Sequence, residues 1–359
     1  MPIDYSCQSV EQKSFLVGSI ARALAVFCVD EVVVFDDDEK SYYNNSRNDN
    51  SNNDDEAYES PIAKTNNQLR GSDSQSTGFT AYSDPSHYLA HVLSYLETPP
   101  YLRKHLFPMH PNLRTAGLLP SLDMPHHLRA NEWCDYREGI VVSGVDQSEG
   151  NASKSNRNRQ SSNANGESVV DTGLPQKVVL PGTYLPQNSR ATVRFSSQDD
   201  QTSAEAVDPS APRTEAGYYW GYYVRRCQSL STVFTECPFD GGYDLSFGTS
   251  ERGLPISHVL EQSTPKNDRG DDATPPSPDH KHLLIIFGGV AGLETAARND
   301  PQLQDMGIRP AEVEKLFDHW VNLLPGQGSR TIRTEEAIWL GLSGLRGLAE
   351  GSYRPKRST

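Results

Sequence analysis

The string PGQGSRTIRT at residues 325–334 contains residue types that bind phosphate groups. Gly326 and Gly328 allow the backbone to approach a ligand closely, and Arg330 and Arg333 lie beside them. A guanidinium group binds phosphate through two parallel hydrogen bonds. The string lacks the lysine of a P-loop and the spacing of a dinucleotide fingerprint. A structural turn would explain the glycines but would leave the two arginines unexplained.

Two other glycine-bearing segments precede this string, TSERG at 249–253 and FGG at 287–289. Taken alone, FGG is typical of any turn from a strand into a helix, and Glu251 and Arg252 could simply pair with each other. Each of the three segments nevertheless follows an apolar run. In an open α/β sheet, ligands bind at the carboxyl ends of the strands. Together the segments predict a cofactor pocket built from backbone amides and carbonyls.

The elements that must position these segments alternate between helix and strand. Continuous apolar runs at 283–287 and 321–324 predict strands buried on both faces. Near the start of the chain, residues 14–28 predict a helix and residues 32–35 a short buried strand. A helix that begins near residue 86 should stop before Pro99. The final helix should begin near Thr334, with Thr334 as its cap and two acidic residues in its first turn.

The middle of the chain has a different character. Short β-type runs, REGIVV, VVDTGL, KVVLPG and RATVRF, follow one another between turns and predict a small all-β module, most simply a five-stranded barrel. Polar tracts at 36–80, 143–168 and 254–280 are expected to loop out, and 196–213 is expected to be a linker. Residues 217–239 predict an aromatic-rich element that runs into a helix. The β module therefore looks inserted into a larger α/β domain.

Composition excludes several classes of protein. The net charge is −14, and about half of it lies in the acidic tract 36–60. No apolar run reaches the roughly 20 residues that span a bilayer, and the first residues do not resemble a secretory signal. Five widely spaced cysteines fit free thiols in a reducing compartment. His126 and His127 lack a third ligand at suitable spacing, so no metal site is expected, and no hydrolase motif is present.

Residues 101–129 are basic and could contact an RNA backbone, or could be a solvated linker between domains. The candidates for RNA binding are Arg103, Lys104, Arg114 and Arg129.

Several strings in the order that they take here resemble a known family. The strings are IARALAVFCVDEVVVFD, YLETPPYLRKHLFP, AGLLPSLDMPHHLR, YREGIVV, GYYWGYYVR, PFDGGYDLSFGTSERG, IIFGG and NLLPGQGSRTIRTEEA. The chain resembles the SPOUT-class RNA methyltransferases, which have a trefoil-knotted α/β fold with an inserted small all-β, OB-like domain. It is similar above all to the subgroup with a human member at centromeres and spindle poles. The resemblance implies a first α/β part at 1–107, the insert at 108–212 and the knotted part at 213–359.

The resemblance also implies an activity. The expected reaction is methyl transfer from S-adenosylmethionine (SAM) to RNA by a homodimer, in the nucleus or cytoplasm, with spindle or centromere proteins as further partners. Arg252, Arg330 and Arg333 would hold phosphate or position the target base. A non-catalytic RNA-binding or spindle scaffold with the same fold is the alternative. The implied SAM-binding residues are Thr249, Ser250, Glu251, Arg252, Gly253, Phe287, Gly288, Gly289, Leu324, Pro325, Gly326, Gln327, Gly328, Ser329, Thr331, Ile332 and Thr334.

Overall fold

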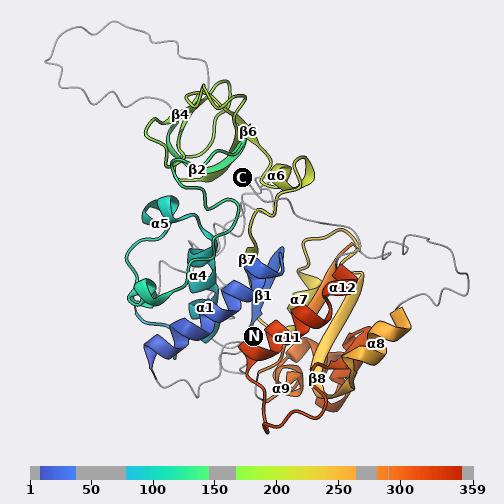
Figure 1. Cartoon of the computed structure of the whole chain (residues 1–359). Coiled ribbons are helices and arrows are strands. Elements are labelled where there is room, and N and C mark those ends of the chain that lie inside the picture. Colours follow the sequence, from blue (N-terminus) through green and yellow to red (C-terminus); the bar gives the residue numbers. More distant parts are fainter. Residues whose placement is uncertain (1–8, 38–77, 145–166, 264–280, 290, 350–359) are drawn as a thin grey trace, which may run out of the picture. The chain divides into compact units, whose positions relative to one another are not determined.

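The computed structural model describes residues 9–37, 78–144, 167–263, 281–289 and 291–349 (Figure 1). The chain divides into two compact units. The first comprises residues 1–96, 110–122 and 222–354, and the second comprises 97–109, 123–221 and 355–359. Most of the three polar tracts predicted to loop out, 36–80, 143–168 and 254–280, lies outside the described residues.

The first unit contains a parallel three-stranded sheet with the order β10-β8-β9. Strand β8 (Leu245–Pro255) lies between β9 (Leu283–Ile286) and β10 (His319–Asn322). The continuous apolar runs at 283–287 and 321–324 fit a parallel sheet, because parallel strands covered on both faces need apolar side chains on both faces. Strand β10 follows β9 in the chain but pairs on the other side of β8.

Helices cover both faces of this sheet. Leu284 and Ile286 contribute to one core cluster, and their neighbours Leu283 and Ile285 contribute to another, as alternation along a strand requires. The first cluster includes residues of α7 (Leu230–Thr235), α9 (Leu293–Arg298), α10 (Pro301–Asp305) and η3 (Pro310–Leu316). The second includes residues of α8 (Ile256–Ser263) and α12 (Arg346–Ala349), and α11 (Thr334–Gly344) packs on α1 (Val10–Val26).

A second parallel pair in the first unit joins β1 (Glu31–Phe35) to β7 (Tyr223–Cys227). A buried ion pair of 2.7 Å between Arg225 Nε and Glu31 Oε1 links the two strands. Helix α4 (Pro85–Glu97) ends before Pro99, as predicted, and α5 (Pro100–Leu106) begins after it. Two single-turn helices follow, η1 (Pro111–Leu113) and η2 (Ala116–Leu118).

The second unit contains a five-stranded antiparallel sheet with the order β4-β3-β2-β5-β6. A parallel bridge between Val179 and Ser203 joins β4 to the residues just before β6, so the two edges of the sheet meet. Val141, Val170 and Val193 are buried in its core. The elements are β2 (Tyr136–Gly144), β3 (Ser168–Asp171), β4 (Val178–Leu180), β5 (Arg190–Arg194), β6 (Glu205–Val207) and α6 (Ala211–Thr214).

Three sequence-based expectations are wrong in detail. Strand β6 lies in the predicted linker 196–213, because its three residues are fixed by pairing with β5 rather than by a pattern of their own. Helix α8 lies in the predicted loop 254–280, where Ile256, Val259 and Leu260 have helical spacing. Thr334 is the first helical residue of α11 and not its cap. The Glu336 carboxylate instead accepts a hydrogen bond of 2.9 Å from the Arg333 N–H.

None of the helices in the described ranges combines the length and apolar character needed to cross a membrane.

Candidate cofactor site

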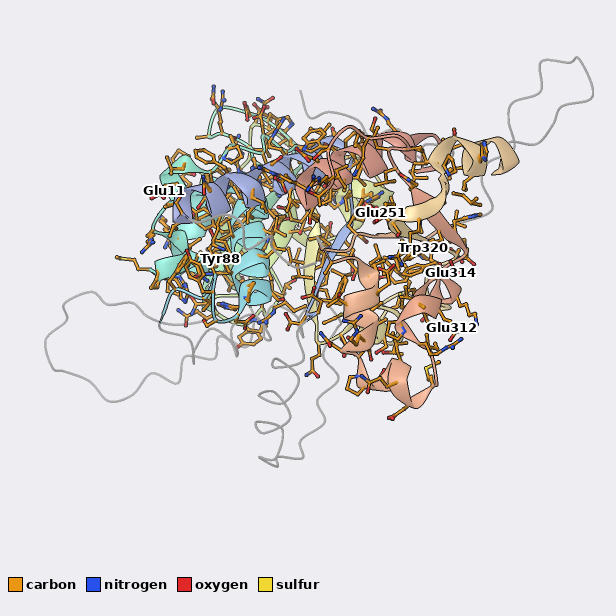
Figure 2. All side chains as sticks on the ribbon, turned by 90° about the horizontal axis from the view of Figure 1, so that it is seen from below. Glu11, Tyr88, Glu251, Glu312, Glu314 and Trp320 are labelled. Carbon is orange, nitrogen blue, oxygen red and sulfur yellow. The ribbon has the colours of Figure 1, made fainter. Side chains whose placement is uncertain are left out.

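The three glycine-bearing segments meet at one edge of the parallel sheet, because the carboxyl ends of parallel strands lie on the same side. Residues 249–253 belong to β8 rather than to a turn after it. Gly248 is paired with Trp320 and Leu254 with Val321, so the residues between them bulge out of the ladder. Glu251 in this bulge and Trp320 on β10 are labelled in Figure 2.

Hydrogen bonds tie the bulge to both neighbouring strands. Thr249 Oγ1 donates to the carbonyl oxygen of Ile286 at 3.0 Å, directly before FGG. Asn322 Nδ2 donates to the carbonyl oxygen of Glu251 at 2.8 Å. The Asn322 side chain also accepts a hydrogen bond of 3.0 Å from the N–H of Leu324, directly before the third segment in chain order, residues 325–334. The bulge is therefore held between the other two segments.

Two glycines of β8 allow this close packing. A Cβ on Gly248 would lie 2.5 Å from the Trp320 ring and 2.7 Å from Phe317. A Cβ on Gly253 would collide with the backbone of Val321, whose Cα and N would both be 2.7 Å away. A backbone neighbour cannot move aside as the end of a side chain can, so Gly253 is required by the bulge.

Helix α11 closes the site from one side. A Cβ on Gly341 would lie 2.8 Å from the Phe287 ring and 3.4 Å from Leu323 Cδ1. Phe287 of the second segment and Leu323, two residues before the third, therefore both contact this helix at Gly341. The predicted cofactor residue Thr334 is buried at its first position.

The third segment is open to solvent over most of its length. Pro325, Gly326, Gly328, Ser329 and Thr331 are exposed. Gly326 has a φ of +76°, which favours glycine, and a Cβ on Gly328 would meet no atom within 4 Å. Leu254 and Leu324 expose 58% and 42% of their surface at this edge, so apolar surface is available to a ligand.

The charged groups of the site include one ion pair that the sequence did not predict. Arg252 does not pair with its neighbour Glu251. Its NH1 atom lies 3.5 Å from Oε1 of Glu294, in the helix that follows FGG. The side chains of Arg330 and Arg333 are exposed.

Two participants in the site, Asn322 and Glu294, were missed in the sequence. Asn322 begins the quoted string NLLPGQG, and Glu294 comes five residues after Gly289. The signal for both was a polar residue at an otherwise apolar strand end or helix start.

The predicted RNA-binding residues are divided between the two units. Arg114 belongs to the first unit, where its guanidinium lies 4.8 Å from the centre of the Phe79 ring. Arg103, Lys104 and Arg129 belong to the second. Arg103 Nε donates to the carbonyl oxygen of Thr98 at 2.9 Å, whereas Lys104 is exposed and Arg129 pairs loosely with Glu132 at 3.9 Å. Because the four residues are divided between the two units, they do not form a single cluster within one unit.

His126 and His127 take part in a buried polar network in the second unit. Both Nε2 atoms hydrogen-bond the carbonyl oxygen of Glu97, at 2.9 and 2.6 Å. The Glu97 carboxylate also binds Arg190 at 2.7 Å. In the described part of the chain, no group of three or more metal-ligating side chains could hold a metal ion.

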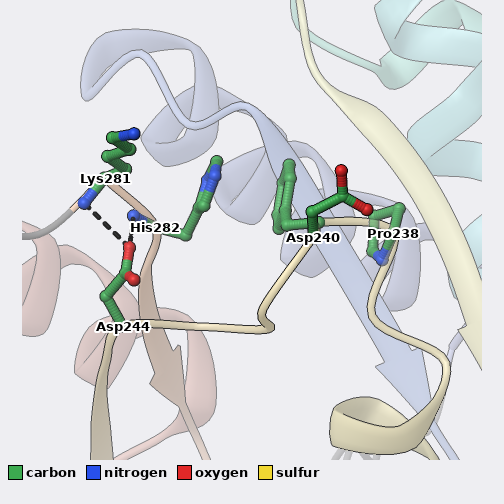
Figure 3. A pocket seen from close by; sticks show the side chains of 6 residues that line it. Pro238, Asp240, Asp244, Lys281 and His282 are labelled. Carbon is green, nitrogen blue, oxygen red and sulfur yellow. Dashed lines mark hydrogen bonds between the residues drawn. The ribbon is translucent and has the colours of Figure 1, made fainter.

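A shallow pocket lies at the opposite edge of the parallel sheet (Figure 3). Its Asp244 precedes β8 and accepts hydrogen bonds of 2.9 Å from the N–H groups of Lys281 and His282, which precede β9. The ring of His282 stacks on Phe239. Since the amino ends of the strands form this edge, the pocket is not part of the candidate cofactor site.

Comparison with known proteins bears on what this site does. The family described as "Putative RNA methyltransferase" matches residues 3–345 of the chain. A human protein named "28S rRNA (uridine-N(3))-methyltransferase" is 40% identical over 97% of this chain and 77% of its own length. Mouse and Drosophila melanogaster proteins of the same name are 37% and 36% identical, over 98% and 95% of this chain and 75% and 59% of their own lengths.

These relatives are named as enzymes, so the alternative of a non-catalytic scaffold is not favoured. None of the three names refers to centromeres or spindles, and the predicted likeness to a spindle-associated member has no support. The matched region includes all three glycine-bearing segments and their strands. The chain belongs to this family of RNA methyltransferases.

Proposed function

We propose that this chain transfers a methyl group from SAM to N3 of a uridine in ribosomal RNA. The convergence of the three predicted segments on one sheet edge carries the proposal. The hydrogen bonds from Thr249 to Ile286 and from Asn322 to Glu251 support a single site rather than three separate turns. The uridine and its N3 atom come from the names of the human, mouse and Drosophila melanogaster relatives.

The chemistry of this edge fits SAM. An adenosine group needs apolar contacts and backbone hydrogen-bonding groups, and its binding loop must leave space for it. Exposed Leu254 and Leu324 offer apolar contacts, and Gly326 and Gly328 leave open space beside the backbone. We propose that the predicted SAM-binding residues hold the cofactor here. Arg330 and Arg333 would hold RNA phosphate, because both are exposed beside the same loop.

The SPOUT fold and the OB-like insert are part of the proposal. Strand β10 pairs with β8 on the side opposite β9, although β9 lies between β8 and β10 in the chain. This strand order supports the knotted SPOUT fold. The strand order of the second unit and its parallel bridge at Val179 support a closed five-stranded barrel.

We also propose that the enzyme is a homodimer. Phe15 and Val26 on α1 and Leu340 on α11 expose 57%, 45% and 37% of their surface, and α1 and α11 pack together. Location in the nucleus stays a prediction, and spindle proteins are not proposed as partners.

The test is methyl transfer itself. The purified chain is incubated with methyl-labelled SAM and ribosomal RNA from cells that lack the enzyme, and the digested RNA is analysed by mass spectrometry. The proposal expects 3-methyluridine at one position. A labelled product on another base or atom, or no product from a folded protein that binds SAM, would contradict it.

A further inference from the structure

Arg252 and Glu294 join the first two segments of the candidate site by charge. Arg252 NH1 lies 3.5 Å from Glu294 Oε1, and 74% of the arginine side chain but only 23% of the glutamate side chain is exposed. Glu294 folds back over the turn that follows FGG, so that a Cβ on Gly292 would overlap its Oε2 atom. Gly292 has a φ of +77°, which also favours glycine. The carboxylate is thus held at the edge of the site.

Among the other carboxylates nearby, Glu251 of the bulge is exposed and makes no ion pair with Arg252, whereas Glu336 and Glu335 are directed elsewhere. Glu336 accepts the Arg333 N–H at 2.9 Å and so begins α11. Glu335 precedes Trp339 by one turn of the same helix, and Trp339 Nε1 donates to Ser19 Oγ on α1 at 3.3 Å. Glu335 therefore lies on the side of α11 that faces α1 rather than on the Gly341 side that contacts Phe287.

Methylation of uridine at N3 requires a proton acceptor. The N3–H group of uracil is a hydrogen-bond donor between two carbonyl acceptors, and N3 becomes a nucleophile only as this proton leaves. When bound, SAM supplies the methyl group: a bond forms between N3 and the methyl carbon, the carbon–sulfur bond breaks with its electron pair going to sulfur, and the N3 proton must pass to a base.

We propose that Glu294 accepts the N3 proton of the target uridine and that Arg252 donates a hydrogen bond to the adjacent carbonyl oxygen. This inference rests on the proposed function. As N3 loses its proton, negative charge develops on that carbonyl oxygen, where a guanidinium stabilises it. The protonated Glu294 then returns the proton to solvent, since part of its side chain is exposed.

The same pair would distinguish uracil from cytosine. A carboxylate beside a guanidinium presents an acceptor next to a donor. Uracil offers the complementary donor and acceptor at N3 and its carbonyl oxygens. Cytosine has an acceptor at N3, which would face the Glu294 carboxylate without a proton between them. Leaving such a polar group unpaired costs free energy, so cytidine would be rejected.

The test compares Glu294→Gln with Glu314→Gln, an exposed glutamate in η3 that is labelled in Figure 2. Glu294→Gln should keep the wild-type dissociation constant for SAM in calorimetry. Its single-turnover rate of methyl transfer should fall by about 100- to 10,000-fold, the usual contribution of a general base. Its rate should also rise about tenfold per pH unit between pH 6 and 8, because solvent must then remove the proton. Glu314→Gln should behave as wild type.

A readout independent of methyl transfer is the affinity for a short RNA substrate with either uridine or cytidine at the target position. Wild type should prefer the uridine RNA, and Arg252→Gln should lose most of that preference. A Glu294→Gln enzyme with wild-type rate and pH profile would overturn the inference while leaving the proposed function intact. Wild-type enzyme that yields no 3-methyluridine would instead contradict the proposed function, and the inference with it.

Discussion

Glycine residues at the carboxyl edge of the sheet serve two purposes that are distinguished by their surroundings. Gly248, Gly253 and Gly341 are glycines because protein atoms occupy the space where a side chain would lie. At Gly326 and Gly328 an added side-chain carbon would meet nothing within 4 Å, so the space beside them is open to a ligand. The first group should respond to substitution in stability and the second in ligand binding.

Gly253→Ala tests the first purpose. The added carbon would collide with the Val321 backbone, so we expect the free energy of unfolding to fall by about 1–3 kcal/mol, as in other overpacked sites. Gly117→Ala is the matched control, since its added carbon would meet no atom within 4 Å. Urea denaturation followed by circular dichroism measures both. Equal stability of the two variants would show that the bulge is not packed as described.

The sequence predicted the three segments that meet at this edge better than it predicted the contacts between them. The three glycine-bearing segments are recognisable because glycine next to apolar runs is a local signal. The pairing of Arg252 with Glu294 instead of Glu251 depends on how β8 bulges against β10, and no local pattern encodes it. Thr334 looked like a helix cap by residue type, but Glu336 satisfies the N–H group at that helix start.

Among the elements of the second unit, the buried network around Glu97 joins segments that are far apart in sequence. The Glu97 carboxylate contacts Arg190 of β5 at 2.7 Å and His126 at 2.9 Å. Arg190 Nε also binds Glu138 of β2 at 2.6 Å. Within the second unit, Glu97, residues 126–127 and strands β2 and β5 are thus linked by ion pairs and hydrogen bonds.

Glu97→Gln should destabilise the second unit. Removal of one partner from a buried ion pair leaves the other charge uncompensated, which costs about 3–5 kcal/mol. Glu205→Gln is the control, because Glu205 also binds an arginine, Arg194, at 2.8 Å but is 67% exposed. An exposed pair contributes about 0–1 kcal/mol. Thermal denaturation should separate the two variants clearly, and similar melting temperatures would refute the structural role of the network.

Acid should weaken the same unit. Burial, together with nearby His126, lowers the pKa of His127 from 6.5 to about 3. Burial opposes ionisation of Glu97, but Arg190 and His126 outweigh it and hold the pKa of Glu97 well below its ordinary value of 4.5. Both pKa values are lower in the folded state, so both contributions are present at high pH and are lost as the pH falls. Stability should decline below pH 6.5 and more steeply below pH 4.5.

His127→Gln isolates the histidine contribution, since its amide can still donate to the Glu97 carbonyl oxygen. We expect the decline between pH 6.5 and 4.5 to flatten in this variant, measured by denaturant unfolding at several pH values. An unchanged decline would mean that His127 is not held in its neutral form.

At the scale of the whole molecule, continuous apolar runs were enough to predict strands at 32–35, 283–287 and 321–324, which correspond to β1, β9 and β10. Strand β7 was not predicted, since YVRRC carries no such run. Four of the five strands of the antiparallel sheet were also predictable, because each contains a run of β-branched residues. Strand β6 was not, since three residues, EAV, carry no pattern and are strand only through pairing with β5. Helix α8 was not predicted, because its few helically spaced apolar residues lie directly before a polar tract. How non-neighbouring strands pair is a tertiary property, and only the family resemblance suggested it.

The proposed homodimer makes a prediction at this scale. Phe15 on α1 is 57% exposed and lies one turn from Ser19, which contacts α11. Sedimentation should give twice the chain mass of 39.7 kDa for wild type and a shift toward the single chain for Phe15→Glu. Met306→Glu, at another exposed apolar residue, should leave the dimer intact. A monomeric wild type, or a Phe15→Glu variant that stays dimeric, would contradict this assignment of the interface.

Calorimetric titration with SAM tests the central claim, that the carboxyl edge of β8, β9 and β10 holds the cofactor, most directly. Wild type is compared with Gly328→Val and with Gly117→Val, two exposed glycines whose substitution meets no protein atom within 4 Å. We predict that wild type and Gly117→Val bind SAM equally. Gly328→Val should stay folded and bind at least tenfold more weakly, a loss of about 1.4 kcal/mol or more. Equal SAM affinity in all three proteins would contradict the claim.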